Sequence, residues 1–147
     1  MAHSYTNLLY HVVYGTKLRQ PLIDEEFQPR LYEYVGGTIR GLKGVSLQIG
    51  GVEDHVHILA KLPPTIAVSD FLEKLKSNSS KWAKSVRRDF GWQAGYSAFS
   101  VSESQVERVK RYIQNQREHH RKSSFEEELI ELLKAHGLAY DPNHLWT

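Results

Sequence analysis

The sequence predicts an α+β protein with a ferredoxin-like split βαβ antiparallel sheet, helices on one face of the sheet, and additional C-terminal helices. Three observations support this fold class. Strand and helix patterns follow one another in the order strand, helix, strand, strand, helix, strand. Two further amphipathic segments follow, and no repeat or low-complexity segment interrupts the chain. With 147 residues, 40% of them hydrophobic, the chain is expected to form one domain over residues 1–147.

A strand and a helix begin the pattern. Residues 5–14 are rich in alternating aromatic and β-branched side chains, which indicates a strand buried on at least one face. Asp24 is the expected N-cap of a helix whose apolar residues recur at helical spacing. Residues 45–51 and 52–61 are the next two expected strands.

Glycine, proline and serine residues mark the next boundaries. Gly50-Gly51 is the expected hairpin turn between the two strands. After a Pro-Pro pair, Ser69 is the expected cap of a helix that ends at about Asp89. Residues 96–101 alternate as a short strand.

Two C-terminal helices complete the predicted elements. Ser104-x-x-Glu107 has the pattern of a capping box and is expected to begin a helix that runs to about Arg121. A last helix is expected after Ser124. The tail at residues 140–147 is apolar enough to dock on the rest of the protein.

The composition excludes several classes of site. There are no cysteines, which rules out disulfides, thiolate zinc sites and cysteine nucleophiles, so any metal binding must use histidine. The first residues lack the basic and apolar regions of a signal peptide, and no apolar run of about 18 residues occurs. We therefore expect a soluble cytoplasmic protein with no membrane partner.

The basic residues are clustered, although the net charge is only +2. One cluster lies in residues 81–88 and a second in residues 108–122, whereas acidic residues gather in residues 24–26 and 126–131. Such clusters are typical of solvated helix faces, and they also provide the positive charge that binds a polyanion. The charge pattern alone leaves both interpretations open.

His55 and His57 flank one hydrophobic residue in the segment Asp54-His55-Val56-His57. Residues spaced i, i+2 on a strand point to the same side, about 7 Å apart. Two neutral imidazoles placed in this way can bind one divalent ion if a third ligand comes from elsewhere in the fold. Half-buried structural histidines have the same spacing, so the spacing alone does not establish a metal site.

Tyr112 and Gln116 supply the chemistry that the histidine pair lacks. Their i, i+4 spacing places both on one face of the predicted third helix, where they can lie against the sheet near His55 and His57. A glutamine oxygen and two imidazoles form an uncharged ligand set that suits Mg²⁺ or Mn²⁺ bridging to a phosphate. Tyrosine is a known nucleophile, although a packed structural role is the alternative for one of eight tyrosines.

These motifs resemble the single-tyrosine HUH transposases of small bacterial insertion sequences, the IS200-like transposase family. In that family two histidines flank a hydrophobic residue, and a later helix carries the tyrosine. The resemblance covers nearly the whole chain. The similar segments are Tyr10-His11-Val12-Val13 with Thr16-Lys17, residues 51–57, residues 76–81, residues 109–116 with His119-His120, and the ending with His136-Gly137 and Tyr140-Asp141.

The resemblance implies a metal-dependent single-strand DNA endonuclease and strand transferase. Tyr112 would attack a DNA phosphate, form a 5′-phosphotyrosine link and leave a free 3′-hydroxyl. His55, His57 and Gln116 would bind the divalent metal, Mg²⁺ or Mn²⁺, that orients the phosphate. Members of the family act on single-stranded or hairpin DNA at element ends, and they form homodimers in which the tyrosine helix can serve the partner's histidine pair.

The resemblance also gives the basic clusters a purpose, because DNA binding needs Lys and Arg beside the phosphates. The roles of His119 and His120 are left open: each could contact the substrate, transfer a proton or lie on the surface without a function. Two other functions stay open as well: a domesticated protein that binds DNA hairpins without mobilising an element, and a small metallohydrolase with a non-nucleic substrate. The expected DNA-contact residues are Lys74, Lys81, Lys84, Arg87, Arg88 and Arg111.

Overall fold

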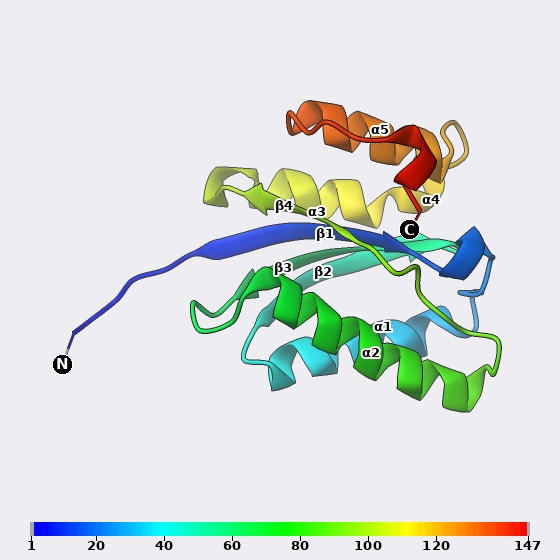
Figure 1. Cartoon of the computed structure of the whole chain (residues 1–147). Coiled ribbons are helices and arrows are strands. Elements are labelled where there is room, and N and C mark those ends of the chain that lie inside the picture. The colour runs from blue at the N-terminus through cyan, green and yellow to red at the C-terminus, as the bar shows by residue number, and fades with distance from the viewer. Residues whose placement is uncertain (1, 147) are drawn as a thin grey trace.

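Four antiparallel strands form one sheet in the computed structural model, which describes residues 2–146 (Figure 1). One helix joins β1 to β2 and another joins β3 to β4, so each βαβ unit is split by a strand of the other unit. The predicted ferredoxin-like fold is confirmed. In spatial order the strands are β2 (Val45–Val52), β3 (His55–Leu62), β1 (Leu8–Gly15) and β4 (Ser97–Val101), and the connecting helices are α1 (Gln28–Gly41) and α2 (Val68–Val86).

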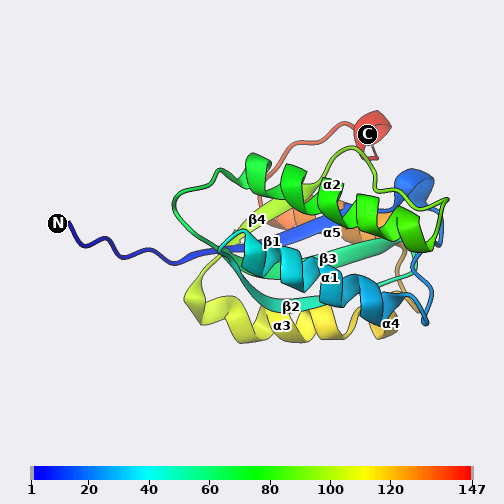
Figure 2. The same ribbon diagram turned by 90° about the horizontal axis from the view of Figure 1, so that it is seen from below.

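Helices α1 and α2 lie side by side on one face of the sheet (Figure 2). Their apolar faces form the larger hydrophobic core with alternate strand residues, among them Val12 and Tyr14 of β1 and Val56 and Ile58 of β3. Because side chains alternate along a strand, the residues between them point to the opposite face. The two histidines of β3 are among these residues.

The opposite face of the sheet is covered by α3 (Val106–Gln114), α4 (Gln116–His119) and α5 (Phe125–Ala135) (Figure 1). A second apolar cluster joins the sheet to α5, and the tail, including the 3₁₀ helix Pro142–His144, docks beside it as predicted, up to the last described residue. The histidines of β3 are therefore enclosed between the sheet and the C-terminal helices. The cluster contains Val13, Phe99, Phe125, Leu129 and Leu133, with Tyr140, Leu145 and Trp146 packed against it.

The hairpin between β2 and β3 turns at residues 53–54, so the predicted turn at Gly50-Gly51 is wrong. Both glycines lie inside β2. A Cβ added to Gly50 would collide with the backbone carbonyl of Ile113 and stand 2.8 Å from its Cγ2, because α3 crosses the strand there. Gly50 allows the backbones of β2 and α3 to approach each other closely. This close approach, rather than a turn, is a common reason for a glycine inside a strand.

The predicted third helix is divided in two. Asn115 adopts non-helical dihedral angles between α3 and α4, and a 3₁₀ turn at Glu103–Gln105 precedes α3. The predicted capping box at Ser104 is absent, since that hydroxyl pairs with Ser102 instead. Ser124 does form a capping box with Glu127 at the start of α5, with hydrogen bonds of 3.1 and 3.2 Å.

The starts of the first two helices also differ from the sequence prediction. Asp24 accepts a hydrogen bond from the backbone N–H of Phe27 at 2.8 Å, so it caps the turn that leads into α1 rather than α1 itself. Helix α2 begins at Val68, one residue before the predicted cap Ser69. Within residues 2–146, no helix combines the length and the apolar character that crossing a bilayer requires.

Candidate active site

His55 and His57 are the first and third residues of β3, and both side chains are buried on the face covered by the C-terminal helices. Their ring centroids are 5.1 Å apart, as expected for neighbours on one side of a strand. Asp54, in the turn before β3, accepts a hydrogen bond from Nδ1 of His55 at 2.8 Å, which leaves Nε2 of that ring facing the helices.

Tyr112 of α3 and Gln116 of α4 meet the histidine pair within the same chain. Oε1 of Gln116 lies 3.0 Å from Nε2 of His55, and the rings of Tyr112 and His57 have centroids 5.7 Å apart. The four residues singled out in the sequence are therefore brought together. The break at Asn115 does not separate Tyr112 from Gln116, since both still face the sheet.

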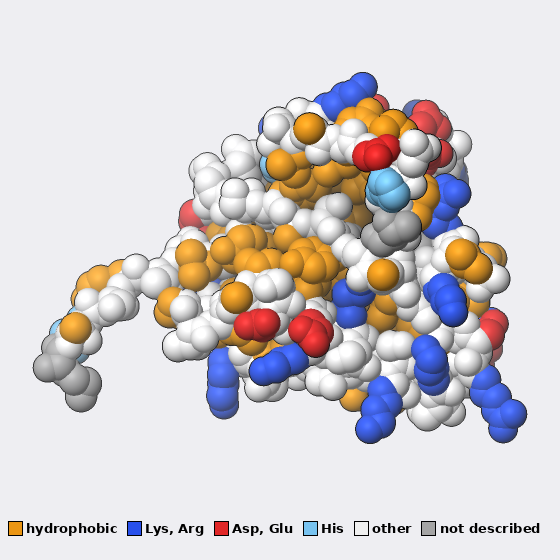
Figure 3. Space-filling model, viewed as in Figure 1, with side chains coloured by type: hydrophobic (Ala, Val, Ile, Leu, Met, Phe, Trp, Pro, Cys, Tyr) orange, Lys and Arg blue, Asp and Glu red, His pale blue; other side chains and the backbone are white. Residues whose placement is uncertain are grey.

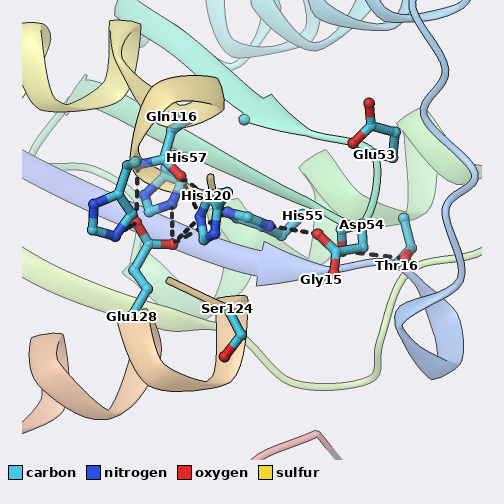
Figure 4. Close-up of polar contacts among 12 residues, drawn as sticks. Gly15, Thr16, Glu53, Asp54, His55, His57, Gln116, His120, Ser124 and Glu128 are labelled. Atoms are coloured by element: carbon cyan, nitrogen blue, oxygen red, sulfur yellow. Dashed lines mark hydrogen bonds and ion pairs between the residues drawn. The ribbon is translucent and has the colours of Figure 1, made fainter. Parts of the chain in front are cut away.

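Glu128 of α5 lies at the centre of this group, and the sequence-based prediction missed it (Figure 4). One carboxylate oxygen, Oε1, lies 3.0 Å from Nε2 of His57 and 3.2 Å from Nε2 of His55. The other oxygen, Oε2, accepts hydrogen bonds from the Gln116 amide at 2.9 Å and from the Tyr112 hydroxyl. The carboxylate is only 1% exposed, so its contacts with these side chains replace contacts with water.

A signal for Glu128 was present in the sequence. It directly precedes Leu129 and lies three residues after Phe125, so it belongs to the apolar face of the last helix, where an acidic side chain needs a buried partner. The sequence-based prediction also missed His11, a polar residue on a strand that was expected to be buried. It lies on the strand predicted at residues 5–14, and its Nε2 lies 2.8 Å from Nδ1 of His57.

His119 and His120, whose roles the sequence left open, lie at different depths in this group. Nε2 of His120 lies 3.0 Å from both Oε1 of Gln116 and Oε1 of Glu128, and the side chain is 10% exposed. His119 is more exposed, and its Nε2 lies 3.5 Å from Oε2 of Glu128. His120 therefore belongs to the inner group, and His119 lies at its rim beside the ring of Tyr112.

Burial and neighbouring charges shift the pKa values of these histidines in opposite directions. Burial lowers the pKa of His57 to about 4, and burial together with His57 lowers the pKa of His11 to about 3. Burial would also lower the pKa of His55, but hydrogen bonds to Asp54 and Glu128 raise it to about 9. Two neighbouring imidazoles thus differ in charge at neutral pH.

The two groups joined by the phenol hydrogen bond have shifted pKa values too. Burial alone would raise the pKa of Glu128, but hydrogen bonds from His120, His55 and His57 hold it well below its usual range. Burial and the adjacent carboxylate raise the pKa of the Tyr112 phenol above its usual value. Glu128 is therefore ionised and Tyr112 protonated at neutral pH.

We expect the metal-free protein to lose stability as the pH falls from 6.5 to 4. The pKa values of His57 and His11 lie near 6.5 in the unfolded chain and at about 4 and 3 in the folded protein, so over this range the unfolded chain binds protons that the folded protein does not. Glu128, whose folded pKa is lowered, adds to the loss below its usual value of 4.5.

His55 acts in the opposite direction. Its folded pKa of about 9 exceeds the unfolded value, so its stabilisation is present below pH 6.5 and is lost as the pH rises towards 9. Between pH 4 and 8, the melting temperature of the metal-free protein should therefore be highest near pH 6.5. A His11→Gln variant, which removes one titrating ring, should show a shallower fall on the acid side. A wild-type melting temperature that stays constant from pH 6.5 to 4 would contradict these shifts.

The tyrosine can be reached from outside through a cavity of about 550 Å³ between β4, α3 and α5. Its lining includes His11, Arg108, Tyr112 and His136. A second hollow, of about 340 Å³, also borders Tyr112, and its lining includes Glu118, His119 and Lys122. The nucleophile candidate thus borders two openings, and each has at least one basic side chain in its lining.

Five of the six expected DNA-contact residues lie away from the histidine cluster. Lys74, Lys81 and Lys84 belong to α2, and Arg87 and Arg88 follow it, on the other face of the sheet, where Figure 3 shows basic side chains along the molecule's lower edge. Only Arg111 lies on α3, next to Tyr112 in the chain.

Two of the five already have partners in the fold. Nζ of Lys84 donates to the carbonyl of Phe90 at 2.6 Å, and Arg87 donates to the carbonyl of Leu22 at 2.6 Å. These two side chains support the loop structure around them. The other three are exposed.

Comparisons with known proteins agree with this architecture. Residues 4–116 match the family described as "Transposase IS200 like". Among curated proteins, the transposase for insertion sequence element IS200 of Salmonella typhimurium is 30% identical over 131 residues, which cover 80% of this chain and 82% of that protein. The ISDra2 transposase TnpA of Deinococcus radiodurans is 25% identical over 119 residues, which cover 74% and 84%.

Two solved structures have the same fold. A predicted transposase from Deinococcus radiodurans R1 matches with a TM-score of 0.64 at 23% identity, over 79% of this chain and 96% of that one. A REP-associated tyrosine transposase bound to a REP hairpin matches with a TM-score of 0.61 at 14% identity, over 82% and 73%. His120 and Glu128 lie beyond the residues matched to the family. Since that match runs from before the first strand through the histidine pair to Gln116, the chain belongs to the IS200-like transposase family, whose members cleave DNA.

Proposed function

We propose that this transposase cleaves and rejoins single-stranded DNA at the ends of its element, with Tyr112 as the nucleophile. One observation carries the proposal: the Tyr112 hydroxyl, the Gln116 amide and the imidazoles of His55 and His57 all meet the carboxylate of Glu128 within one chain. A phosphate that enters this group meets a nucleophile and a set of metal-binding side chains together.

The donor set fits a divalent cation. Ligand atoms of His55, His57 and Glu128 lie within 4.8 Å of one another, and all three side chains are buried. In this proposal His55, His57 and Gln116 hold the ion, with Glu128 beside them. When bound, the ion polarises a phosphoryl oxygen and stabilises the charge that develops on it.

A side chain of this protein can accept the proton that Tyr112 loses when it attacks the phosphate. The Tyr112 hydroxyl donates its hydrogen bond to Glu128, which is therefore the nearest proton acceptor. As the bond from the phenol oxygen to phosphorus forms, the bond from phosphorus to the 3′-oxygen breaks. The phenol proton passes to Glu128, and the leaving 3′-oxygen takes up a proton from solvent water and becomes the free 3′-hydroxyl. In rejoining, a 3′-hydroxyl attacks the phosphotyrosine, and Tyr112 regains its proton.

The DNA strand would reach Tyr112 through the cavity beside Arg108, close to Arg111 on the same helix. We further propose that the exposed basic residues of α2 contact DNA farther from the cleaved phosphate, as in hairpin binding. The structural relative bound to a REP hairpin supports this part of the proposal. The slope of binding affinity against salt concentration would measure the number of phosphate contacts.

The homodimer that the resemblance implies is also part of the proposal. Strands β2 and β4 form the two edges of the sheet, and an edge strand can pair with a second copy of the chain. Because one chain alone assembles the candidate site, the dimer would serve to hold two DNA ends rather than to complete each site. Light scattering that showed a monomer at micromolar concentration would contradict the dimer.

A labelled-strand assay tests the cleavage chemistry. The protein is incubated with single strands that contain the element ends, labelled at the 3′ or the 5′ end, in Mn²⁺ or Mg²⁺. We expect the 3′ label to appear in a denaturation-resistant protein adduct and the 5′ label in a shorter free strand. A chelator should prevent both products.

Two results would decide against the proposal. An adduct that carries the 5′ label would mean a 3′ linkage and the opposite polarity of attack. Tight binding of DNA hairpins with no adduct in any metal would instead support the domesticated hairpin-binding protein.

A further inference from the structure

Three imidazole nitrogens converge on one carboxylate oxygen, Oε1 of Glu128, and two of them also approach Oε1 of Gln116 (Figure 4). Nε2 of His120 lies 3.0 Å from Oε1 of Gln116 and 3.0 Å from Oε1 of Glu128. Nε2 of His55 lies 3.0 and 3.2 Å from the same two atoms, and Nε2 of His57 lies 3.0 Å from Oε1 of Glu128. His120 thus makes the same two contacts as His55, and it shares the contact with Glu128 with both histidines of β3.

In His55 and His120, the hydrogen-bond partner of Nδ1 determines whether Nε2 carries a hydrogen or a lone pair. Nδ1 of His120 lies 2.7 Å from the backbone carbonyl of Ser123, which can only accept, so Nδ1 carries the hydrogen. Nδ1 of His55 faces the carboxylate of Asp54 in the same way. In a neutral ring, Nε2 then presents a lone pair to the centre. A carbonyl or carboxylate partner on the outer nitrogen is the usual arrangement of a metal-binding histidine.

Lone pairs that face oxygen lone pairs repel unless a proton or a metal cation lies between them, and in the metal-free protein His55 supplies one such proton. Protonating all three rings would bury three positive charges against the single carboxylate of Glu128, at a large cost in desolvation. One divalent cation among neutral imidazoles satisfies every donor atom at once. His55 and His57 are fully buried and His120 is 10% exposed. Bulk water therefore has little access to the space between these nitrogen and oxygen atoms.

The spacing of the donor atoms fits the same conclusion. Donors bound to one ion at about 2.1 Å stand about 3.0 to 3.4 Å from their neighbours in octahedral or tetrahedral sites. The separations between histidine nitrogens and the two oxygens are 3.0 to 3.2 Å. Three imidazoles also change the metal preference, because imidazole favours first-row transition ions, whereas Mg²⁺ prefers oxygen ligands and water.

We propose that His120 and Glu128 are metal ligands together with His55, His57 and Gln116, and that this centre takes a first-row transition ion in preference to Mg²⁺. The proposal deepens the proposed function and rests on its metal site. Both added ligands lie beyond residues 4–116, so they come from a segment that the family match does not cover.

Cobalt titration of the metal-free protein tests the added ligands. The visible absorption of bound Co²⁺ reports its ligands directly, without DNA and without catalysis. We expect His120→Asn to weaken Co²⁺ binding about 10- to 100-fold and to change the spectrum. Glu128→Gln should do the same if it folds, which circular dichroism will show. In competition, millimolar Mg²⁺ should not displace Mn²⁺ from the wild type.

Two other histidines serve as matched controls. His136 stacks on Phe99 outside the group, so His136→Asn should bind Co²⁺ like the wild type. His119 lies at the rim, and His119→Asn should change the affinity less than about threefold. If His119→Asn and His120→Asn weaken binding equally and His57→Asn does not, the ion lies among His119, His120 and Glu128 instead. His120→Asn with wild-type affinity and spectrum would overturn the proposal.

The outcome is separable from that of the proposed function. If the spectra show no role for His120 or Glu128 while the wild type still forms the Tyr112 adduct, only the five-ligand centre is wrong. If the spectra change as expected and no adduct forms with any strand or metal, the metal centre stands and the cleavage chemistry is wrong.

Discussion

A Tyr112→Phe variant is expected to form no covalent adduct with single-stranded DNA, and its cleavage rate should fall by at least about 10³-fold. The substitution removes only the hydroxyl that meets Glu128 and keeps the ring that packs edge-on against His57 and His11. DNA affinity should therefore change little. The assay is the labelled-strand reaction, read on a denaturing gel, with binding measured separately at the same salt concentration.

A second tyrosine provides the control for this variant. Tyr96 lies on the surface before β4, 39% exposed and outside the histidine cluster. Tyr96→Phe should form the adduct at the wild-type rate. If Tyr112→Phe forms as much adduct as the wild type, Tyr112 is not the nucleophile, and the hydroxyl at Glu128 has a structural role.

A Gly50→Ala variant should lose both stability and activity, although residue 50 touches no substrate in the proposed mechanism. The added methyl group would collide with the backbone of Ile113, the neighbour of Tyr112 in α3. Strand and helix must separate, at a cost of about 1 to 3 kcal/mol in the free energy of unfolding. A displacement of the nucleophile by about 1 Å should reduce cleavage about 10²-fold. Denaturant unfolding and the labelled-strand assay measure the two effects.

Gly41 is the matched glycine for this test. It lies at the end of α1 with an ordinary backbone conformation, and nothing lies within 4 Å of an added Cβ. Gly41→Ala should stay within about 1 kcal/mol of the wild type, on the stabilising side, and cleave DNA normally. Gly50→Ala with wild-type stability would show that α3 does not pack on β2 as closely as described.

Local periodicity was enough to predict which residues of the candidate site lie together when they are close in the sequence. The i, i+2 spacing on a strand places His55 and His57 on one face, and the i, i+4 spacing places Tyr112 and Gln116 together despite the break at Asn115. The order of the strands and helices likewise predicted the ferredoxin-like sheet. These features depend on backbone geometry that short segments already specify.

The features that were missed depend on contacts between distant segments. Gly50 resembles a turn residue until α3 packs against it, and Glu128 joins the site only because α5 covers the sheet. Periodicity also identifies the exposed face of α2 without indicating that the sheet separates it from the histidines. Neither Glu128 nor His120 has a distinctive spacing relative to His55, since several helices, strands and loops lie between them.

The most direct test of the proposed function is to identify the residue that carries the DNA. Trypsin cuts after Arg111 and Arg117, which releases residues 112–117 as a peptide with Tyr112 as its only hydroxyl side chain. After nuclease digestion of the trapped adduct, mass spectrometry should find a 5′-phosphonucleotide on Tyr112 in this peptide. A nucleotide on any other peptide, or an adduct whose tyrosine peptide is unmodified, would contradict the proposed function.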